Sequence, residues 1–399
     1  ELHPGAAVVW AHPYRDGARP SDEDLTSPLF DAIEIYSSNY SVAEAYRGLE
    51  DWHRLRFTAI SGTDTHARSY GGVYPTVFDH PIGSMEDLVR EIRAGRCRPF
   101  FRETMKTGSS STSVTEVAMG KNGGRDRSKT IIVKRHPSDH AWKRGERSFR
   151  IMEAVASSGF TSDRFRMPLP LESEPEKHAL IESGIRGRTL FDCVLEGDEE
   201  TARTSVDLAA RWLARLHNMH LAVTSTEAFI AAERGRLARY VQGLHDTSHP
   251  QADRVMEAKD RVLAREIARV EDQADFLVQG HGDFHPKNIL LGRDSPGDAG
   301  TSYVAAIDFA SSHRMPRAFD VGTFLAQFRN QFFHRERARE KVSESFFYDS
   351  YVRESDELPP DFAADVELYR ARCGLSILYY LNKVGMGDTE DFWRVMVEM

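Results

Sequence analysis

Residues 278–291 of this 399-residue chain combine histidine, aspartate and asparagine with apolar runs on both sides. The segment has the sequence Val-Gln-Gly-His-Gly-Asp-Phe-His-Pro-Lys-Asn-Ile-Leu-Leu, which places Asp283 and Asn288 five residues apart. A second apolar run, residues 304–307, ends at Asp308. Phosphoryl transfer needs a carboxylate that orients the acceptor hydroxyl and oxygen ligands that hold a metal ion against the phosphates. One Asp after a strand is usually a turn residue, but these three residues together predict that chemistry.

Strands are expected to position these three residues. Residues 289–291 leave the segment as an apolar strand, and residues 304–307 return as a buried strand after a polar hairpin. Asp308 then lies at the end of the second strand, where a metal-binding carboxylate is expected.

After residue 105, the sequence first predicts mainly strands and then mainly helices. Apolar patterns predict strands at 114–119, 130–133 and 179–182, a turn at Asn122-Gly123-Gly124, and helices at 142–156, 202–219, 227–244 and 251–271. A β-rich region followed by a helical region is therefore expected.

The segment His281-Gly282-Asp283-Phe284-His285-Pro286-Lys287-Asn288, followed by Ile307-Asp308-Phe309, resembles the aminoglycoside phosphotransferase and choline kinase superfamily. Leu213-Ala214-Arg215-Leu216-His217 and Phe319-Asp320-Val321-Gly322 resemble two further segments of that superfamily. The resemblance covers about residues 106–399. It implies an α+β, two-lobed protein-kinase-like fold with a β-rich N-lobe and a helical C-lobe. Residues 308–310 are Asp-Phe-Ala, not the Asp-Phe-Gly of protein kinases.

The resemblance implies a role for each of these residues. Asp283 corresponds to the catalytic base, Asn288 and Asp308 to ligands of Mg²⁺, and Asp320 to a structural residue. A protein of this kind is expected to use ATP or GTP with Mg²⁺. It would move the γ-phosphate to a hydroxyl of a small molecule, such as an aminoglycoside, an amino sugar, a choline-like compound or another alcohol.

Two charged residues correspond by position to the superfamily's phosphate-binding pair. Lys134 follows the strand predicted at 130–133, where a lysine grips the α and β phosphates. Its partner should be a glutamate on the next helix. Glu146 fits that role better than Glu153, because it precedes the apolar stripe of the helix.

Two further segments are expected to contact the nucleotide. Ser109, Ser110 and Ser111 could cover the phosphates with small side chains and backbone N–H groups. They lack a G-x-G-x-x-G pattern, so a flexible linker is the alternative. Glu182, Ser183 and Gly184 resemble the hinge that hydrogen-bonds the adenine.

Residues 1–105 alternate short apolar runs with turn signals, which indicates an α/β layer. His12 ends one predicted strand, and Asp64 and His66 form an Asp-x-His triplet after another, a donor set suited to Zn, Mn or Fe. With Gly71-Gly72-Val73-Tyr74-Pro75-Thr76, these features resemble the C-terminal half of the polymerase-and-histidinol-phosphatase (PHP) family of metal-dependent phosphoesterases. That family's opening His-x-His and middle ligands have no counterpart in the chain. We therefore expect weak metal binding and no hydrolase activity from this fragment.

Composition narrows the class of protein. The net charge of −9 argues against a nucleic-acid binder, and three widely spaced cysteines give neither a disulfide framework nor a zinc spacing. No apolar run approaches the roughly 20 residues of a membrane span. We expect a cytoplasmic enzyme that binds a nucleoside triphosphate and a small hydroxyl-bearing substrate, with no prediction of oligomeric state. The expected domains are 1–105, 106–186 and 187–399, and the last two should fold without the first.

Two other functions stay open. One is a PHP phosphoesterase in which the kinase-like part is a regulatory or nucleotide-binding module. The other is an idle kinase-like binding protein, which is disfavoured because Lys134, Asp283, Asn288 and Asp308 are all present.

The acceptor is not fixed by the sequence. Acidic residues could bind ammonium groups, and aromatic residues could form a choline-like cage. A solvated acidic face and core packing are the simpler interpretations. The acidic set is Glu354, Asp356, Glu357, Asp361, Asp365 and Glu367, and the aromatic set is Phe346, Phe347, Tyr348, Tyr351, Tyr379 and Tyr380.

Overall fold

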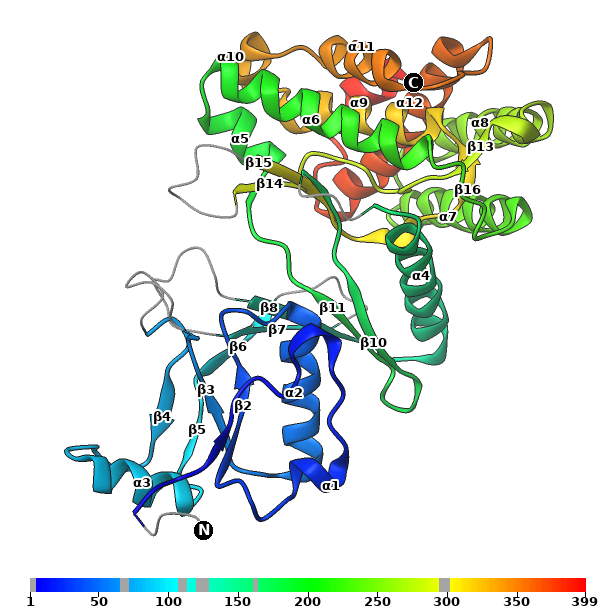
Figure 1. Ribbon diagram of the computed structural model, residues 1–399. Coiled ribbons are helices and arrows are strands. Elements are labelled where there is room, and N and C mark those ends of the chain that lie inside the picture. Colours follow the sequence, from blue (N-terminus) through cyan, green and yellow to red (C-terminus); the bar gives the residue numbers. More distant parts are fainter. Residues whose placement is uncertain (1–4, 65–71, 107–112, 120–128, 161–163, 294–301) are drawn as a thin grey trace. The chain divides into compact units, whose positions relative to one another are not determined.

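The computed structural model describes residues 5–64, 72–106, 113–119, 129–160, 164–293 and 302–399 (Figure 1). These residues divide into two compact units. Unit 1 contains the described residues up to 143 together with 169–184, and unit 2 contains 144–168, 185–293 and 302–399. The predicted turn at 122–124 lies outside the described residues.

Unit 1 begins with a parallel three-stranded sheet in the order β1-β2-β3. Every residue of the central strand is buried, as expected for a strand covered on both faces. A capping box between Ser41 and Glu44 starts the long helix that follows it. The elements of this part are β1 (Val9–Trp10), α1 (Asp22–Leu25), β2 (Ala32–Tyr36), α2 (Val42–Leu55), β3 (Ala59–Ser61), β4 (Thr76–Phe78), α3 (Met85–Arg93) and β5 (Cys97–Pro99).

The second part of unit 1 is a five-stranded antiparallel sheet in the order β10-β11-β8-β7-β6. Its elements are β6 (Phe101–Lys106), β7 (Ser113–Met119), β8 (Lys129–Arg135), β10 (Pro170–Glu174) and β11 (Ala179–Ser183). The strands predicted at 114–119, 130–133 and 179–182 are confirmed. The edge strand β6 starts at Phe101, before the domain boundary expected at 105. Helix α4 (Asp139–Ser157) begins in unit 1 and ends in unit 2.

One hydrophobic core joins the two sheets of unit 1. Ile35 and Tyr36 of β2 belong to the same buried cluster as Met119 of β7, Ile131 of β8 and Ile181 of β11. The first hundred residues therefore contribute side chains to the core of the five-stranded sheet. The expectation that residues 106–399 fold without them stays a prediction, and this shared core argues against it, because removal of the first hundred residues would expose apolar surface.

Unit 2 is mainly helical, as the spacing of apolar residues after residue 196 predicts. Its helices are α5 (Leu190–Glu196), α6 (Glu199–His217), α7 (Thr226–Asp246), α8 (Ala252–Asp272), α9 (Ala318–Phe332), α10 (Glu336–Lys341), α11 (Glu344–Glu354), α12 (Phe362–Lys383) and α13 (Glu390–Glu398). A kinase-like fold with mixed α and β content is thus confirmed in this coarse form. Within the described residues, no helix combines the length and apolarity needed to cross a bilayer.

Short strands in unit 2 carry the segment that contains Asp283. They are β9 (Phe165–Arg166), β12 (Arg188–Thr189), β13 (Leu277–Gln279), β14 (Ile289–Arg293), β15 (Ser302–Ala306) and β16 (Arg314–Pro316). Four of them form a sheet in the order β12-β14-β15-β9, and β13 pairs with β16. The loop between β13 and β14, residues 280–288, is called the catalytic loop below.

The shared core of unit 1 predicts coupled unfolding. Ile35→Ala and Ile131→Ala each remove a fully buried side chain, so each should lower the free energy of unfolding by about 2–5 kcal/mol. Both variants should shift the same urea transition, followed by tryptophan fluorescence. Leu29→Ala is the control, because Leu29 is 63% exposed and its loss should change stability by no more than about 0.5 kcal/mol. Two separate transitions, each moved by one variant alone, would contradict a common core.

Candidate active site

The β14–β15 hairpin brings Asn288 and Asp308 together. The antiparallel register pairs Ile289 with Ala306, so the first residue of β14 lies beside the last residue of β15. Beyond this pair, the Ile307 backbone N–H donates to the Asn288 carbonyl at 3.0 Å. Asn288 therefore lies opposite Ile307, the residue before Asp308. Two ligands of one metal ion would need to be neighbours in this way.

A buried carboxylate from another element holds the start of the catalytic loop. Asp320, in the first turn of α9, is 0% exposed. Its two oxygens accept from the backbone N–H groups of His281 and Gly282, both at 2.7 Å. His217 of α6 donates to the same carboxylate from Nε2 at 3.1 Å. Three donors on two separate segments thus converge on one side chain.

His217 reaches Asp320 as a neutral imidazole. Burial lowers the pKa of His217 below its ordinary value. Its Nδ1 lies 2.8 Å from the Tyr351 hydroxyl, so Tyr351 donates to Nδ1 and the imidazole proton stays on Nε2. Tyr351 comes from α11, which extends this buried network to three helices.

Backbone geometry in the loop requires glycine at one position. Gly282 has φ +82°, and a Cβ there would come within 2.0 Å of the Ser311 carbonyl oxygen. The preceding His281 is buried and accepts from the Asp283 N–H at Nδ1 (3.3 Å), which leaves its Nε2 to donate to the Ile307 carbonyl (3.1 Å). His281 thereby ties the start of the loop to the residue before Asp308.

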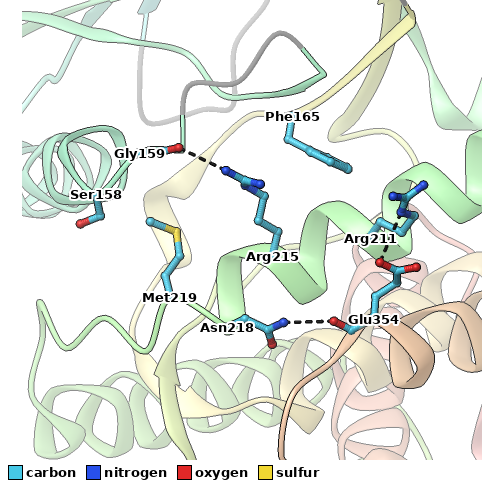
Figure 2. A pocket seen from close by; sticks show the side chains of 8 residues that line it. All are labelled: Ser158, Gly159, Phe165, Arg211, Arg215, Asn218, Met219 and Glu354. Carbon is cyan, nitrogen blue, oxygen red and sulfur yellow. Dashed lines mark hydrogen bonds and ion pairs between the residues drawn. The ribbon is translucent and has the colours of Figure 1, made fainter.

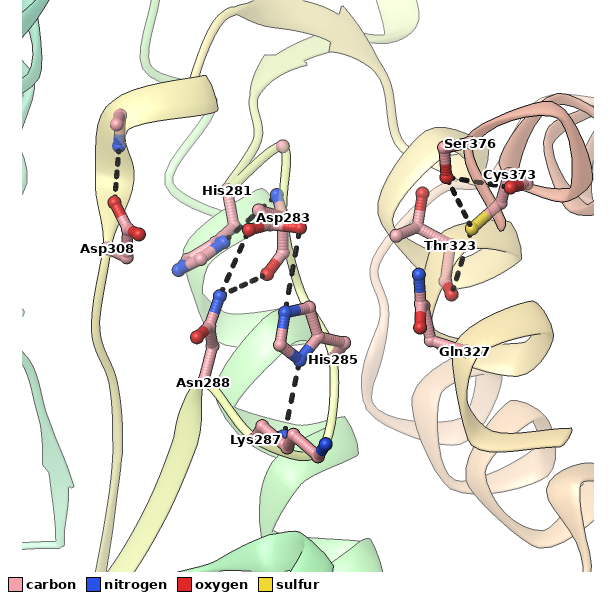
Figure 3. A network of polar contacts seen from close by, with 12 residues as sticks. His281, Asp283, His285, Lys287, Asn288, Asp308, Thr323, Gln327, Cys373 and Ser376 are labelled. Carbon is pink, nitrogen blue, oxygen red and sulfur yellow. Dashed lines mark hydrogen bonds and ion pairs between the residues drawn. The ribbon is translucent and has the colours of Figure 1, made fainter. Parts of the chain in front are cut away.

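Asp283 projects from the loop with a partly exposed carboxylate. Its side chain is 44% exposed, and Asn288 donates from Nδ2 to the Asp283 carbonyl (3.0 Å) and to Oδ2 (3.2 Å), as Figure 3 shows. These contacts orient the Asn288 amide with its oxygen away from Asp283. The structure thus brings Asp283 and Asn288 into direct contact.

His285 supports the loop from within. Its Nδ1 accepts from the Lys287 N–H at 3.2 Å, and its Nε2 lies 3.7 Å from Asp283 Oδ1, beyond hydrogen-bonding distance. Burial lowers its pKa, against the opposing charge of Asp283. A neutral, packed His285 agrees with a structural role.

Asp308 adopts a backbone conformation that few non-glycine residues occupy. Its φ and ψ are both 70°, and its side chain is exposed. Oδ1 accepts weakly from the Ala310 N–H at 3.4 Å, which leaves the second oxygen for another partner. Arg147 of α4 fixes the following turn by donating to the Ala310 carbonyl at 3.1 Å. No pattern in the sequence predicts this contact.

The Asp283 carboxylate affects the pKa of a cysteine in α12. Burial raises the pKa of the Cys373 thiol to about 11, and the carboxylate of Asp283 acts in the same direction. Figure 3 shows Thr323 and Gln327 of α9 beside Cys373 and Ser376 of α12. Residues of helices α9 and α12 therefore lie near the Asp283 carboxylate.

Within unit 1, Lys134 contacts a neighbouring strand of its own sheet. It forms an ion pair with Glu182 of the neighbouring strand β11, and its side chain is 27% exposed. Glu146 pairs with Arg150 one turn further along α4, at 2.9 Å. The predicted Lys134–Glu146 pair joins residues of the two units and stays a prediction.

The predicted hinge residues are partly engaged within their own sheet. The Ser183 N–H donates to the Leu169 carbonyl at 2.9 Å, and the Gly184 N–H donates to the Thr130 carbonyl at 2.7 Å. Adenine recognition by this segment would therefore use other backbone groups than these two donors. Ser109, Ser110 and Ser111 lie outside the described residues.

The predicted metal site in the first hundred residues is only partly described. His12 lies 2.6 Å from Glu34 and 3.6 Å from Asp64, while His66 lies outside the described residues. Burial raises the pKa of Glu34, and its contact with His12 opposes that shift. Among the described residues, no three His, Cys, Asp or Glu side chains have the geometry of a metal site. Metal binding there has no support.

Unit 2 has a pocket of about 390 Å³ that is lined by Glu354 of the acidic set but by none of the residues predicted to bind the nucleotide, the metal ion or the reacting hydroxyl (Figure 2). Arg215 donates to the Gly159 carbonyl at 3.3 Å, and Arg211 pairs with Glu354 at 3.5 Å across it. No residue of the 280–288 loop is among those that line the pocket.

The Asp320 contacts predict a stability cost. Asp320→Ala leaves two backbone donors and His217 without their acceptor, so the free energy of unfolding should fall by about 3 kcal/mol or more, at about 1–3 kcal/mol for each unsatisfied buried donor. Asp207→Ala is the matched control. It removes a surface ion pair with Arg353 (2.6 Å) and should cost less than about 1 kcal/mol. Equal urea midpoints for the two variants would show that Asp320 does not anchor the loop.

Comparison with solved structures gives distant likenesses. An ethanolamine kinase from Plasmodium vivax is 14% identical, with a TM-score of 0.49, covering 75% of this chain and 80% of that one. An aminoglycoside phosphotransferase, APH(3'')-Id, from Streptomyces rimosus is 17% identical, with a TM-score of 0.47, covering 70% and 92%. A choline kinase from Streptococcus pneumoniae is 15% identical, with a TM-score of 0.47, covering 74% and 92%. No curated protein matched the chain.

The family of this chain is assigned by a match between its sequence and a family model. The phosphotransferase enzyme family matches residues 113–353, which is more than half of the chain and includes the catalytic loop, Asp308 and Asp320. The first hundred residues lie outside the match. The chain belongs to the phosphotransferase enzyme family.

Proposed function

We propose that the protein is an ATP- or GTP-dependent kinase that phosphorylates a hydroxyl of a small molecule. The observation that carries this proposal is the grouping of Asp283, Asn288 and Asp308 at one end of the β14–β15 hairpin. Asn288 contacts Asp283 directly and is hydrogen-bonded through its carbonyl to the residue before Asp308. Membership of the phosphotransferase enzyme family supports the same reaction class.

Asp283 is the proposed catalytic base. Its partly exposed carboxylate can accept a hydrogen bond from the acceptor hydroxyl and orient that oxygen toward the γ-phosphorus. The donation from Asn288 Nδ2 fixes the carboxylate without neutralising it. Because the transition state of phosphoryl transfer is loose, this positioning matters more than early proton removal. The hydroxyl proton passes to Asp283 late in the reaction.

Asn288 and Asp308 are the proposed Mg²⁺ ligands. Their donor set fits, because Mg²⁺ prefers hard oxygen ligands and is usually bound by one or two carboxylates together with substrate phosphates. The Asn288 nitrogen is engaged with Asp283, which leaves its oxygen for the metal, and Asp308 has one oxygen without a hydrogen bond. When bound, Mg²⁺ would neutralise charge on the β and γ phosphates.

Lys134 is the proposed phosphate-binding lysine of unit 1. Its ion pair with Glu182 holds the ammonium group beside the end of β8, and an ammonium there is suited to the α and β phosphates. Glu182 thus takes a side-chain role that the sequence did not predict for it.

For residues 1–105 we infer a packing role in place of the alternative function, a PHP-type phosphoesterase. The core shared by β2, β7, β8 and β11 supports this role. His12 is engaged with Glu34, which would have to be displaced before His12 could bind a metal. Elemental analysis of the purified protein tests the inference, because one tightly held Zn, Mn or Fe per chain, lost in His12→Ala, would favour the phosphoesterase.

The catalytic base can be separated from nucleotide binding. Asp283→Asn keeps the shape of the side chain and removes its charge, so turnover should fall by about 10² or more, the usual scale of a lost general base. Nucleotide affinity should survive. Asp253→Asn, an exposed residue of α8, is the control for loss of one negative charge. Unchanged phosphate transfer or background nucleotide hydrolysis in Asp283→Asn would refute the assignment.

The metal ligand should behave differently. Asp308→Asn removes the anionic ligand, so we expect weaker nucleotide binding in the presence of Mg²⁺ together with lower turnover. The measurement is a nucleotide dissociation constant with Mg²⁺ and with EDTA for both variants. A dissociation constant of Asp308→Asn that matches wild type under both conditions would exclude Asp308 from the metal site.

A further inference from the structure

Five of the six acidic residues that could have bound a cationic acceptor already pair with arginine, and the sixth, Glu357, is exposed. Asp356 pairs with Arg317 at 2.6 Å, and Asp365, which is 0% exposed, pairs with Arg269 at 2.7 Å. Three more carboxylates pair with arginine: Glu354, Asp361 and Glu367. A polycationic acceptor would have to displace these arginines, so this set gives no basis for aminoglycoside recognition.

The aromatic residues of α11 are likewise occupied. Phe347 stacks on Phe324 with ring centroids 3.6 Å apart, and both are buried. Tyr351 is buried and hydrogen-bonded to His217. These rings form core, and they do not line a cage for a quaternary ammonium group.

Two cations instead lie together beside the catalytic loop. The Lys287 ammonium is 5.2 Å from the centre of the Phe191 ring, and the Arg335 guanidinium is 5.1 Å from the same centre. Phe191 is attached to the loop, because its N–H donates to the Pro286 carbonyl at 3.1 Å. Phe191, Lys287 and Arg335 are called the Phe191 cation pair below.

Neither cation has a carboxylate partner among the described residues. Arg335 donates from Nη1 to the Gln331 carbonyl at 3.0 Å, which uses one of its five donors and fixes the direction of the others. Lys287 and Arg335 are both exposed, so they are accessible to a ligand. The distance between the two cations cannot exceed the sum of their distances to the ring centre. That upper limit is of the same order as the screening length of physiological salt, about 8 Å. Two like charges beside one ring add their positive potentials, which favours the binding of an anion.

The location relates this pair to the reaction. Lys287 lies four residues after Asp283 in the same loop, and its N–H donates to His285, whose imidazole lies 3.7 Å from Asp283. Arg335 follows α9, one of the two helices with residues near Asp283. A ligand anion bound by the pair would therefore lie beside the loop that carries the proposed base.

We infer that the acceptor is an anionic hydroxyl compound, whose carboxylate or phosphate binds Lys287 and Arg335 while its hydroxyl faces Asp283. This inference rests on the proposed kinase function. The geometry assigns Arg335 as a residue that determines specificity for the acceptor and not for the nucleotide.

The test compares acceptors that differ in charge. Pools of hydroxyl compounds are offered with Mg-ATP and Mg-GTP. The anionic pool includes glycerol 3-phosphate and L-3-hydroxybutyrate, the neutral pool includes glycerol and methyl 3-hydroxybutyrate, and the cationic pool includes choline and kanamycin. Nucleoside diphosphate release is measured above background hydrolysis. We expect release with the anionic pool, and the two classes of anion show whether the group bound is a phosphate or a carboxylate.

The variants then locate the anion site. Arg335→Glu should raise the KM for the active acceptor by about tenfold or more, the scale of one lost charge-assisted hydrogen bond, with less than a twofold change in the KM for the nucleotide. Arg335→Lys should recover part of the loss. Arg337→Glu is the matched control, since Arg337 is an exposed arginine in the first turn of α10, the helix that begins directly after Arg335, and it should leave both KM values unchanged.

Several outcomes would overturn the inference. These are preference for the neutral or cationic pool, no active anionic acceptor despite Asp283-dependent background hydrolysis, equal effects of Arg335→Glu and Arg337→Glu, or a rise in the KM for the nucleotide instead of the acceptor. Failure of the kinase function itself would look different, because wild type would then neither bind nor hydrolyse any nucleoside triphosphate.

Discussion

The Asp320 carboxylate is the contact on which the geometry of the catalytic loop depends. It accepts hydrogen bonds from the backbone of His281 and Gly282 and from the His217 side chain, with no exposure to water. A buried ionised carboxylate is costly unless its oxygens are fully hydrogen-bonded, and an unpaired buried N–H is costly as well. Each partner therefore requires the other. This mutual requirement fixes the residues that immediately precede Asp283.

From that anchor, hydrogen bonds extend to the proposed metal ligands. His281 donates to the carbonyl of Ile307, and Ile307 donates to the carbonyl of Asn288, so the loop and the hairpin are joined on both sides. Asp308 follows directly, in a left-handed conformation that a non-glycine residue adopts only when its surroundings enforce it. The grouping of Asp283, Asn288 and Asp308 thus results from backbone contacts, and the side chains are left available for ligands.

The parts that the sequence predicted are those set by local spacing. Asn288 and Asp308 flank the neighbouring strands β14 and β15, and Asp283 lies in the loop before β14, so the spacing of these residues and the apolar runs beside them predicted their places. The Lys134–Glu182 pair was missed because it depends on which strands become neighbours, and strand order is not encoded in a local pattern. The shared core of Ile35 and Ile131 was missed for the same reason, since it joins segments that are far apart in the chain. The ion pairs of Asp356 and Asp365 were also missed, because their arginine partners are far away in the sequence.

The central claim is that the γ-phosphate moves to an acceptor oxygen, and ³¹P NMR follows that transfer directly. With Mg-nucleotide and hydroxyl compounds of each charge class, the spectrum should lose the γ-phosphate resonance and gain that of a phosphate monoester. The phosphate monoester resonance should be absent when the acceptors are omitted. A γ-phosphate that is unchanged, or that appears only as inorganic phosphate with every acceptor present, would contradict the account.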